Sequence, residues 1–234
     1  MPRRLRVVCP DYPHHVIARG NYRQNVLEQF EDFNQYCYWV KEYQQKYGLE
    51  VLSYCLMNNH VHFILVPKDE DGLSRFFNAL HMRYSQYKNG RMHKKGHLWQ
   101  GRYFSSIIQE RGYLLKVARY VERNPVRAKM VENAWDYVWS SARTHVGIDK
   151  DSIIKTTGYK KILDQLGGMA TWKEFLSGVE TSVDEGIRTS THKGYVIGSE
   201  EFVQQMERET GIRLSPGKVG RPKNKENREL TPIN

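Results

Sequence analysis

The fold is decided by the stretch LEVLSYCLMNNHVHFILVP, residues 49–67, which reads as two β-strands joined by a short turn. Apolar and β-branched residues fill both halves, a composition that is typical of strands buried in a sheet. Between them stand Asn58 and Asn59, which suit a tight hairpin because asparagine tolerates a positive φ better than most residues. The stretch therefore predicts an antiparallel hairpin inside a larger sheet.

Two histidines, His60 and His62, lie one residue apart in the second of these strands. On a strand, residues i and i+2 point to the same face with Cα atoms about 6.6 Å apart, so both imidazoles project together while Val61 and Phe63 enter the opposite face. Two imidazoles at this separation can bind one metal ion and leave coordination positions open for a third ligand and a substrate. An HxH pattern alone is a weak indication of a metal site. The alternative is a pair of half-buried histidines that only make hydrogen bonds.

The rest of the chain up to residue 146 alternates further strands with helices. Residues 14–21 and 102–109 are expected to be strands, and residues 27–47, 72–89 and 112–123 are expected to be helices. Pro125 interrupts the last of these, and a short helix can restart there with Asn124 as its N-cap. Helices set between a few strands, two of them in a hairpin, predict an α+β fold with an antiparallel sheet.

The composition changes after about Gly147. Short helices are expected at residues 158–167, 169–180 and 199–211, and the end of the chain has almost no apolar residues. We therefore expect three parts: a main domain of residues 1–146, a helical C-terminal extension of residues 147–214, and a flexible basic tail of residues 215–234.

The charge of the chain favours a polyanionic partner. Lys and Arg number 36 against 26 Asp and Glu, a net charge of +10 with neutral histidines. The window from Gly72 to Gln109 contains no acidic residue, and aromatic residues that could stack unpaired bases for about 1–3 kcal/mol each are interleaved with its cations. A soluble protein with a solvated basic helix is the alternative. The interleaved aromatic residues are Tyr84, Tyr87, Trp99, Tyr103 and Phe104.

We expect several of these cations to contact the backbone or bases of a nucleic acid. In the tail, GRPKNK is similar to the core of an AT-hook, in which Arg221 would enter a minor groove, although a solubilising tail explains it equally well. The candidate DNA contacts are Arg19, Arg83, Lys88, Lys94, Lys95, Arg102 and Arg221.

The segment ARYVERNPVR contains a second candidate for chemistry. Tyr120 and Asn124 are four residues apart, so on a helix they share one face, and Arg127 would follow on that face if the helix continued. Both residues also have ordinary explanations, because most helical tyrosines only pack and an Asn before Pro is a favoured N-cap.

Three ordered motifs, MNNHVHFILVP, LWQGRYFSS and YVERNPVRAKMV, resemble those of REP-associated tyrosine transposases, a family of single-tyrosine transposases within the HUH endonuclease superfamily. The resemblance extends into WDYVWSSARTHVG and GYVIGSEEFVQQM. It implies a ferredoxin-like antiparallel sheet flanked by helices and makes residues 1–146 the catalytic domain. His60 and His62 would be metal ligands, Asn124 the third ligand and Tyr120 the nucleophile. Relatives often carry Pro at the position of Asn58, a departure that changes the turn and not the ligands.

The same resemblance implies a function and partners. The substrate would be single-stranded DNA bearing a REP-type hairpin, cleaved through a 5′-phosphotyrosine intermediate, with no small-molecule substrate. Similar proteins use Mg²⁺ or Mn²⁺. Imidazole ligands favour Mn²⁺ or another metal that accepts imidazole, because Mg²⁺ prefers oxygen ligands. A monomer or a homodimer is expected.

The setting expected from the sequence is the cytoplasm, in association with the nucleoid. The three cysteines form no CxxC pair, which is typical of a reduced compartment. Neither a signal peptide nor an apolar run of about 18 residues is visible, so no membrane partner is expected.

Three other functions remain open from the residues alone. One is a noncatalytic hairpin-DNA-binding protein, in which the histidines only pack. Another is a metallohydrolase that uses the HxH pair and a metal-bound water, and the third is a relaxase or replication initiator with the same chemistry. Formation of a covalent DNA adduct that depends on Tyr120 separates the first two from the transposase.

Overall fold

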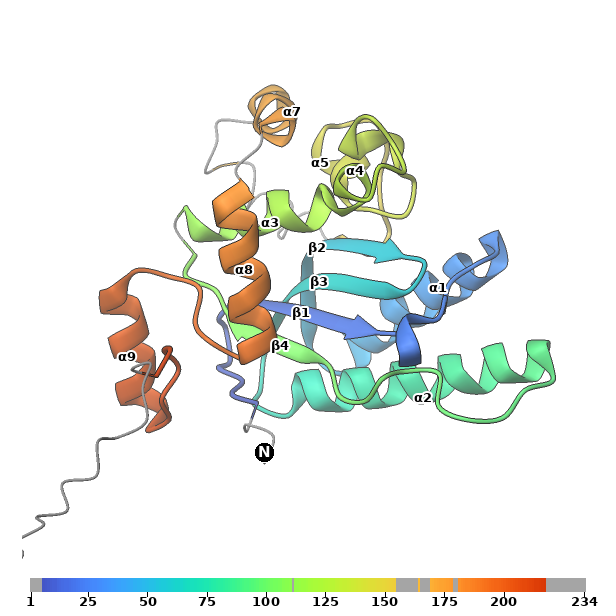
Figure 1. Ribbon diagram of the computed structural model, residues 1–234, viewed down its shortest axis with the longest axis horizontal. Helices are drawn as coiled ribbons and strands as arrows, with labels where there is room; N and C mark the ends of the chain where they lie inside the picture. The colour runs from blue at the N-terminus through green and yellow to red at the C-terminus, as the bar shows by residue number, and fades with distance from the viewer. Residues whose placement is uncertain (1–5, 111, 155–163, 165–168, 179–180, 218–234) are drawn as a thin grey trace, which may run out of the picture.

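The computed structural model describes residues 6–110, 112–154, 164, 169–178 and 181–217. Its centre is a four-stranded antiparallel sheet with the strand order β2-β3-β1-β4 (Figure 1). This is the order of a ferredoxin-like fold and confirms the α+β class expected from the sequence. The strands are β1 (His14–Arg19), β2 (Leu49–Met57), β3 (His60–Pro67) and β4 (Phe104–Ile107).

The β2–β3 hairpin forms as expected, but for a different local reason. Met57 pairs with His60, so Asn58 and Asn59 are the turn, and neither has a positive φ. The turn is held instead by the loop that follows β1: the N–H of Gly20 donates to the carbonyl of Asn59 at 2.8 Å, and the N–H of Val26 donates to the carbonyl of Asn58 at 2.7 Å. The hairpin tip is therefore fixed to the end of β1.

One face of the sheet is covered by two long helices, α1 (Phe30–Lys46) and α2 (Gly72–Met92), which pack against each other. Val61, Phe63 and Leu65 of β3 are buried in the hydrophobic core on this side. Because side chains alternate along a strand, His60 and His62 point to the opposite face, as the sequence predicts.

The opposite face is covered by helices from later in the chain (Figure 1). Ile64 and Val66 pack in a second core with the amphipathic helix α3 (Tyr113–Glu122) and with Trp172 of α7 (Met169–Ser177). Helix α8 (Thr181–Lys193) lies across β4, β1 and α3. Short helices complete this layer: α4 (Asn124–Arg127), α5 (Ala142–His145) and the 3₁₀ turn η2 (Ala134–Asp136). A separate 3₁₀ turn, η1 (Asn21–Arg23), follows β1.

The junction of α3 and α4 differs from the expectation that Asn124 is an N-cap. Asn124 is the first residue of α4 and Arg123 precedes it as the cap. The amide Nδ2 of Asn124 points backwards and donates to the carbonyl of Val121 at 2.9 Å and to that of Tyr120 at 3.2 Å. Pro125 has no N–H to offer the carbonyl of Val121, so the Asn124 side chain takes its place.

The C-terminal part of the described chain packs on the edge of the sheet. Ile197 pairs with Ile108 in parallel, and α9 (Glu200–Thr210) buries Phe202 and Met206 in a small cluster with Ile107. Helix α8 was not expected from the sequence, whereas α7 and α9 confirm two expected helices. Most of the helix expected at residues 158–167, and the tail from residue 218 onward, lie outside the described residues. The division into three parts stays a prediction.

Two further features of the described chain concern its cysteines and its helices. Cys9, Cys37 and Cys55 are free thiols. Within the described ranges, no helix combines the length and the apolar character that crossing a membrane requires.

Candidate active site

The two histidines of β3 form a pair whose rings lie 4.9 Å apart between centroids. His60 uses Nδ1 to bond the side-chain oxygen of Asn59 at 2.6 Å, and His62 uses Nδ1 to bond Nε2 of His15 at 3.1 Å. Among the described residues, neither Nε2 has a hydrogen-bond partner. The two Nε2 atoms are therefore the ones left to bind a ligand.

Both histidines are held in the neutral form that binds metals. Burial lowers the pKa of His60 to about 4, and the neighbouring side chains Arg19, Arg127, His192 and Arg188 contribute in the same direction. Burial also places the pKa of His62 well below its ordinary value, with smaller contributions from neighbouring histidines and arginines. Lone pairs on both rings thus stay available at neutral pH.

Tyr120 of α3 packs directly against the histidine face. Its ring meets those of His62 and His15 edge-on, with centroids 5.8 Å and 5.6 Å away, and only 5% of the residue is exposed. The guanidinium of Arg127 lies 4.1 Å from the ring centroid. Burial raises the pKa of Tyr120, while the positive charges of Arg127, Arg188 and Arg19 oppose that rise. The structure thus brings together Tyr120 and the histidine pair.

Asn124 stands one helical turn beyond Tyr120. Its Nδ2 is occupied by the two carbonyls of α3, which leaves Oδ1 as its ligand atom. Within the described chain, no group of three or more His, Cys, Asp and Glu side chains could hold a metal ion. Two imidazole nitrogens completed by an amide oxygen would be a mixed N/O donor set, which fits Mn²⁺ better than Mg²⁺. The residues present fit a divalent metal, and their roles as ligands stay a prediction.

Arg19 was expected only as a DNA contact, and the other residues around this site were not expected from the sequence. In the β1–β3 register, Arg19 lies opposite His60 and Ile17 opposite His62, so β1 presents Arg19 and His15 on the histidine face. Helix α8 adds three more polar side chains, Arg188, Thr191 and His192, through its packing on β1 and α3. The His14–His15 pair in the first strand was a visible signal, but the sequence alone does not give the register.

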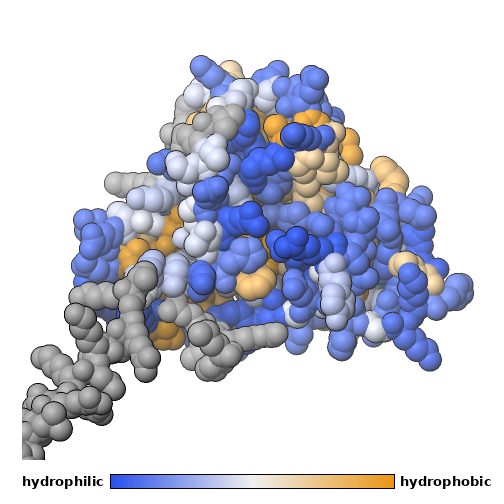
Figure 2. Space-filling model, in the orientation of Figure 1, coloured by the Kyte–Doolittle hydropathy of each residue, from blue (hydrophilic) through white to orange (hydrophobic). Residues whose placement is uncertain are grey.

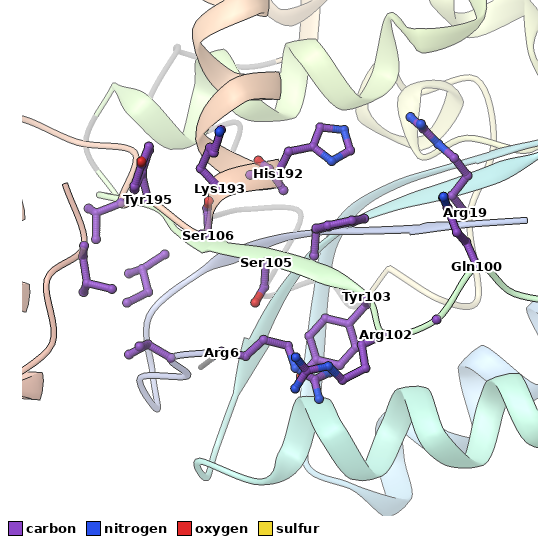
Figure 3. A pocket seen from close by; sticks show the side chains of 18 residues that line it. Arg6, Arg19, Gln100, Arg102, Tyr103, Ser105, Ser106, His192, Lys193 and Tyr195 are labelled. Carbon is purple, nitrogen blue, oxygen red and sulfur yellow. The ribbon is translucent and has the colours of Figure 1, made fainter. Parts of the chain in front are cut away.

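A cavity of about 500 Å³ opens next to this site, between β4 and the end of α8 (Figure 3). It shares Arg19 and His192 with the surroundings of His60. Arg6, Arg102 and Lys193 also line it, and no acidic residue of the described chain does. A cationic cavity without carboxylates suits an anionic ligand. Figure 2 shows that hydrophilic residues dominate the face that contains α8 and α2.

The structure separates the predicted DNA contacts into different places. Arg19 and Arg102 line the cavity, and Lys94 and Lys95 are exposed in the loop after α2. Arg83 is exposed on α2, with its guanidinium 5.7 Å from the ring centroid of Trp39, on the side of the sheet away from the histidines. Arg221 lies outside the described residues.

Lys88 is removed from the candidates for DNA contact. It is only 4% exposed, and its Nζ lies 2.7 Å from both Asp32 Oδ2 and Glu28 Oε2. The ammonium therefore belongs to an ion pair that joins α2 to the start of α1.

The expected stacking role of the aromatic residues near α2 is also largely wrong. Tyr84, Trp99 and Tyr103 are buried in the core that α1 and α2 share, because their large apolar surfaces fill it. Of the five, Phe104 is exposed and Tyr87 is half-buried.

Comparison with known proteins supports the resemblance seen in the sequence. Residues 10–124 match the family model described as "Transposase IS200 like", and this range contains His15, His60, His62, Tyr120 and Asn124. The chain carries an IS200-like transposase domain. The recognition of the family from its three motifs is thereby confirmed.

Two individual proteins agree with this transposase domain. A protein from Haemophilus influenzae named as a REP-associated tyrosine transposase is 24% identical in an alignment of 118 positions, which covers 46% of this chain and 67% of that protein. The solved structure of a REP-associated tyrosine transposase bound to a REP hairpin aligns with a TM-score of 0.50 at 16% identity. That alignment covers 66% of this chain and 98% of the other, and it shows the shared fold.

A crystal structure from Deinococcus radiodurans, of a protein named as a transposase, aligns with a TM-score of 0.36 at 18% identity. The alignment covers 55% of this chain and 92% of that one.

Proposed function

We propose that this transposase is a metal-dependent endonuclease and strand transferase of single-stranded DNA, which binds REP-type hairpins and cleaves through a 5′-phosphotyrosine intermediate. The observation that carries the proposal is the contact of Tyr120 with His62, which brings a phenol to a pair of imidazoles with free Nε2 atoms. A noncatalytic hairpin-binding protein would need no such contact.

In the proposed reaction, Tyr120 is the nucleophile. Its Oη attacks a DNA phosphorus in line with the departing 3′ oxygen, so that a P–O bond to tyrosine forms and the P–O3′ bond breaks. The phenol loses its proton and the 3′ oxygen gains one. The link keeps the reactivity of a phosphodiester, so a different 3′-OH can reverse the step and join two strands without ATP.

A divalent ion held by His60, His62 and Asn124 would supply the polarisation of a nonbridging phosphate oxygen. The chain itself must lower the cost of the phenolate, which is about 4 kcal/mol at pH 7 for an ordinary tyrosine. Arg127, whose guanidinium lies over the Tyr120 ring, and Arg188 of α8 act in this direction because their charges favour the anion. Arg127 is oriented by Asp184, whose Oδ2 lies 3.2 Å from Nη1 of the guanidinium.

The cavity beside the site provides the route for the DNA strand. Arg19 and His192 connect it to the histidine pair, and its other cations can contact successive phosphates. A hairpin substrate is supported by the shared fold with a structure that holds a REP hairpin. Because Tyr120 meets the histidines of its own chain, an active site built within one chain is favoured for either a monomer or a homodimer.

The test is the formation of a protein–DNA conjugate that survives SDS. The full chain is incubated with Mn²⁺ and single-stranded hairpins taken from the DNA that flanks its gene. We expect a conjugate that EDTA abolishes, and we expect Tyr120→Phe to bind the hairpin without forming it. Tyr113→Phe, on the same helix, is the matched control and should form it normally. A conjugate in Tyr120→Phe refutes the nucleophile, and hairpin binding by the wild type without any conjugate supports the noncatalytic alternative.

A further inference from the structure

His15 is a buried residue of the site to which the proposed reaction gives no role. It lies on β1 with 0% exposure, and its Nε2 is 3.1 Å from Nδ1 of His62. The two rings are nearly coplanar, with an interplanar angle of 10° and centroids 5.3 Å apart. The hydrogen bond therefore lies in the plane of both rings, which is the direction in which ring N–H groups and lone pairs point.

The direction of this hydrogen bond follows from the next residue in the chain of contacts. Thr191 of α8 has one hydroxyl hydrogen, which it donates to the carbonyl of Ile187 at 2.9 Å. We assign the single hydroxyl hydrogen to that carbonyl, so that Oγ1 accepts from Nδ1–H of His15, which lies 2.7 Å away. A neutral His15 has only one N–H, so its Nε2 is an acceptor and Nδ1 of His62 is the donor.

His15 is neutral because nothing around it balances a charge. Its side chain is fully buried, with 0% of the residue exposed. Its two hydrogen-bond partners are His62 and Thr191, and neither carries a negative charge. A buried imidazolium in this position would be costly.

We propose that Thr191 and His15 are positioning residues that fix the tautomer and orientation of His62, so that its Nε2 presents a lone pair to the metal. The proposal rests on the proposed function for the identity of that ligand. Residues that orient a metal-bound histidine generally act through its second ring nitrogen. His60 is oriented separately, by Asn59 beside it. Helix α8, from the C-terminal extension, is thereby part of the metal site.

The first experiment reads the tautomer without metal or DNA. Nitrogen-15 NMR of the histidine rings in the full, metal-free chain should show His62 protonated at Nδ1. In Thr191→Val, which keeps the shape of the side chain and removes the acceptor, we expect this preference to be lost. Thr191→Ser keeps the hydroxyl and should retain it, and Thr189→Val is the control for the same exchange at an exposed position of α8.

The second experiment measures binding of Mn²⁺ by calorimetry on the same proteins. We expect Thr191→Val to bind Mn²⁺ roughly 10- to 100-fold more weakly than the wild type, with Thr191→Ser and Thr189→Val close to the wild type. Protonation of wild-type His62 at Nε2, or equal Mn²⁺ affinity in Thr191→Val and wild type, overturns the proposal. The conjugate assay is independent of this readout. If the wild type forms the conjugate but His62 carries its proton at Nε2, only the present inference is refuted. If His62 carries its proton at Nδ1 but no conjugate forms, only the proposed function is refuted.

Discussion

Replacing Lys88 by methionine tests whether this cation of the basic window holds the fold together or contacts DNA. Its ammonium lies 2.7 Å from Oδ2 of Asp32, a carboxylate with 0% exposure. Methionine keeps most of the apolar stem of lysine, so the change removes mainly the charge. We expect Lys88→Met to lower the free energy of unfolding and to leave hairpin binding by the folded protein unchanged.

The magnitude follows from what remains around Asp32. Removing one partner of a buried ion pair costs about 3–5 kcal/mol, because the other charge stays buried. Asp32 would keep Arg91, at 3.0 Å from Oδ1, and the N–H groups of Glu28 and Gln29, at 3.0 Å and 3.1 Å from Oδ2. With these partners retained, we expect a loss of about 2–3 kcal/mol, or a fall of roughly 4–12 °C in the melting temperature.

Urea unfolding measures the loss, and hairpin affinity at several salt concentrations measures any phosphate contact. Adding Asp32→Asn to Lys88→Met completes a double-mutant cycle, in which the double variant should lose less than the sum of the two single variants. The reasoning is refuted if Lys88→Met unfolds like the wild type and the slope of log affinity against log salt becomes shallower by about 0.7–0.9, the effect of one lost phosphate contact.

Three further predictions concern charge and pH. Arg188→Gln should weaken hairpin binding and make the slope of log affinity against log salt shallower by about 0.7–0.9. Arg83→Gln, on the other side of the sheet, should leave this slope unchanged. Equal effects of the two changes would contradict the placement of the DNA. Burial lowers the pKa of His81 to about 3, so its stabilising contribution is complete above its ordinary pKa of 6.5 and is lost as pH falls toward 3. Urea unfolding near pH 5 measures how steeply the free energy of unfolding changes with pH. In His81→Phe this slope should be smaller than in the wild type by up to about 1.4 kcal/mol per pH unit, and an unchanged slope would contradict the burial argument. Finally, calorimetry should show Mn²⁺ binding more tightly to the hairpin complex than to the free protein.

The sequence predicted the parts of this fold that local patterns determine. The β2–β3 hairpin, α1, α2 and α3 follow from strand and helix periodicity, and the HxH spacing correctly placed both histidines on one face. Helix α8 was missed because its sequence, TSVDEGIRTSTHK, contains a glycine and several β-branched residues that disfavour an isolated helix. Packing of Ile187 and Thr191 against the rest of the protein stabilises it.

The roles of the site residues could be predicted only from a known motif. Spacing singled out His60, His62, Tyr120 and Asn124 as candidates, and the family resemblance supplied their expected roles. The structure packs Tyr120 against His62. His15 could not be found, because its role depends on the β1–β3 register and on α8, which lies 176 residues later at Thr191. Lys88 was misjudged for a similar reason: a cation in a window without acids looks free until the fold brings Asp32, from 56 residues earlier, to its side.

The charges around the histidine pair make the binding of metal and DNA depend on each other. Arg19, Arg127 and Arg188 favour a phosphate and a phenolate, but the same charges repel a divalent cation. The proposed ligands are neutral, so within the described chain no carboxylate ligand offsets that repulsion. A DNA phosphate supplies the missing negative charge, and by linkage each partner must strengthen the binding of the other by the same factor. Equal Mn²⁺ affinities with and without the hairpin would mean that the phosphate does not reach the ion, and the role given to the histidine pair in cleavage would then be wrong.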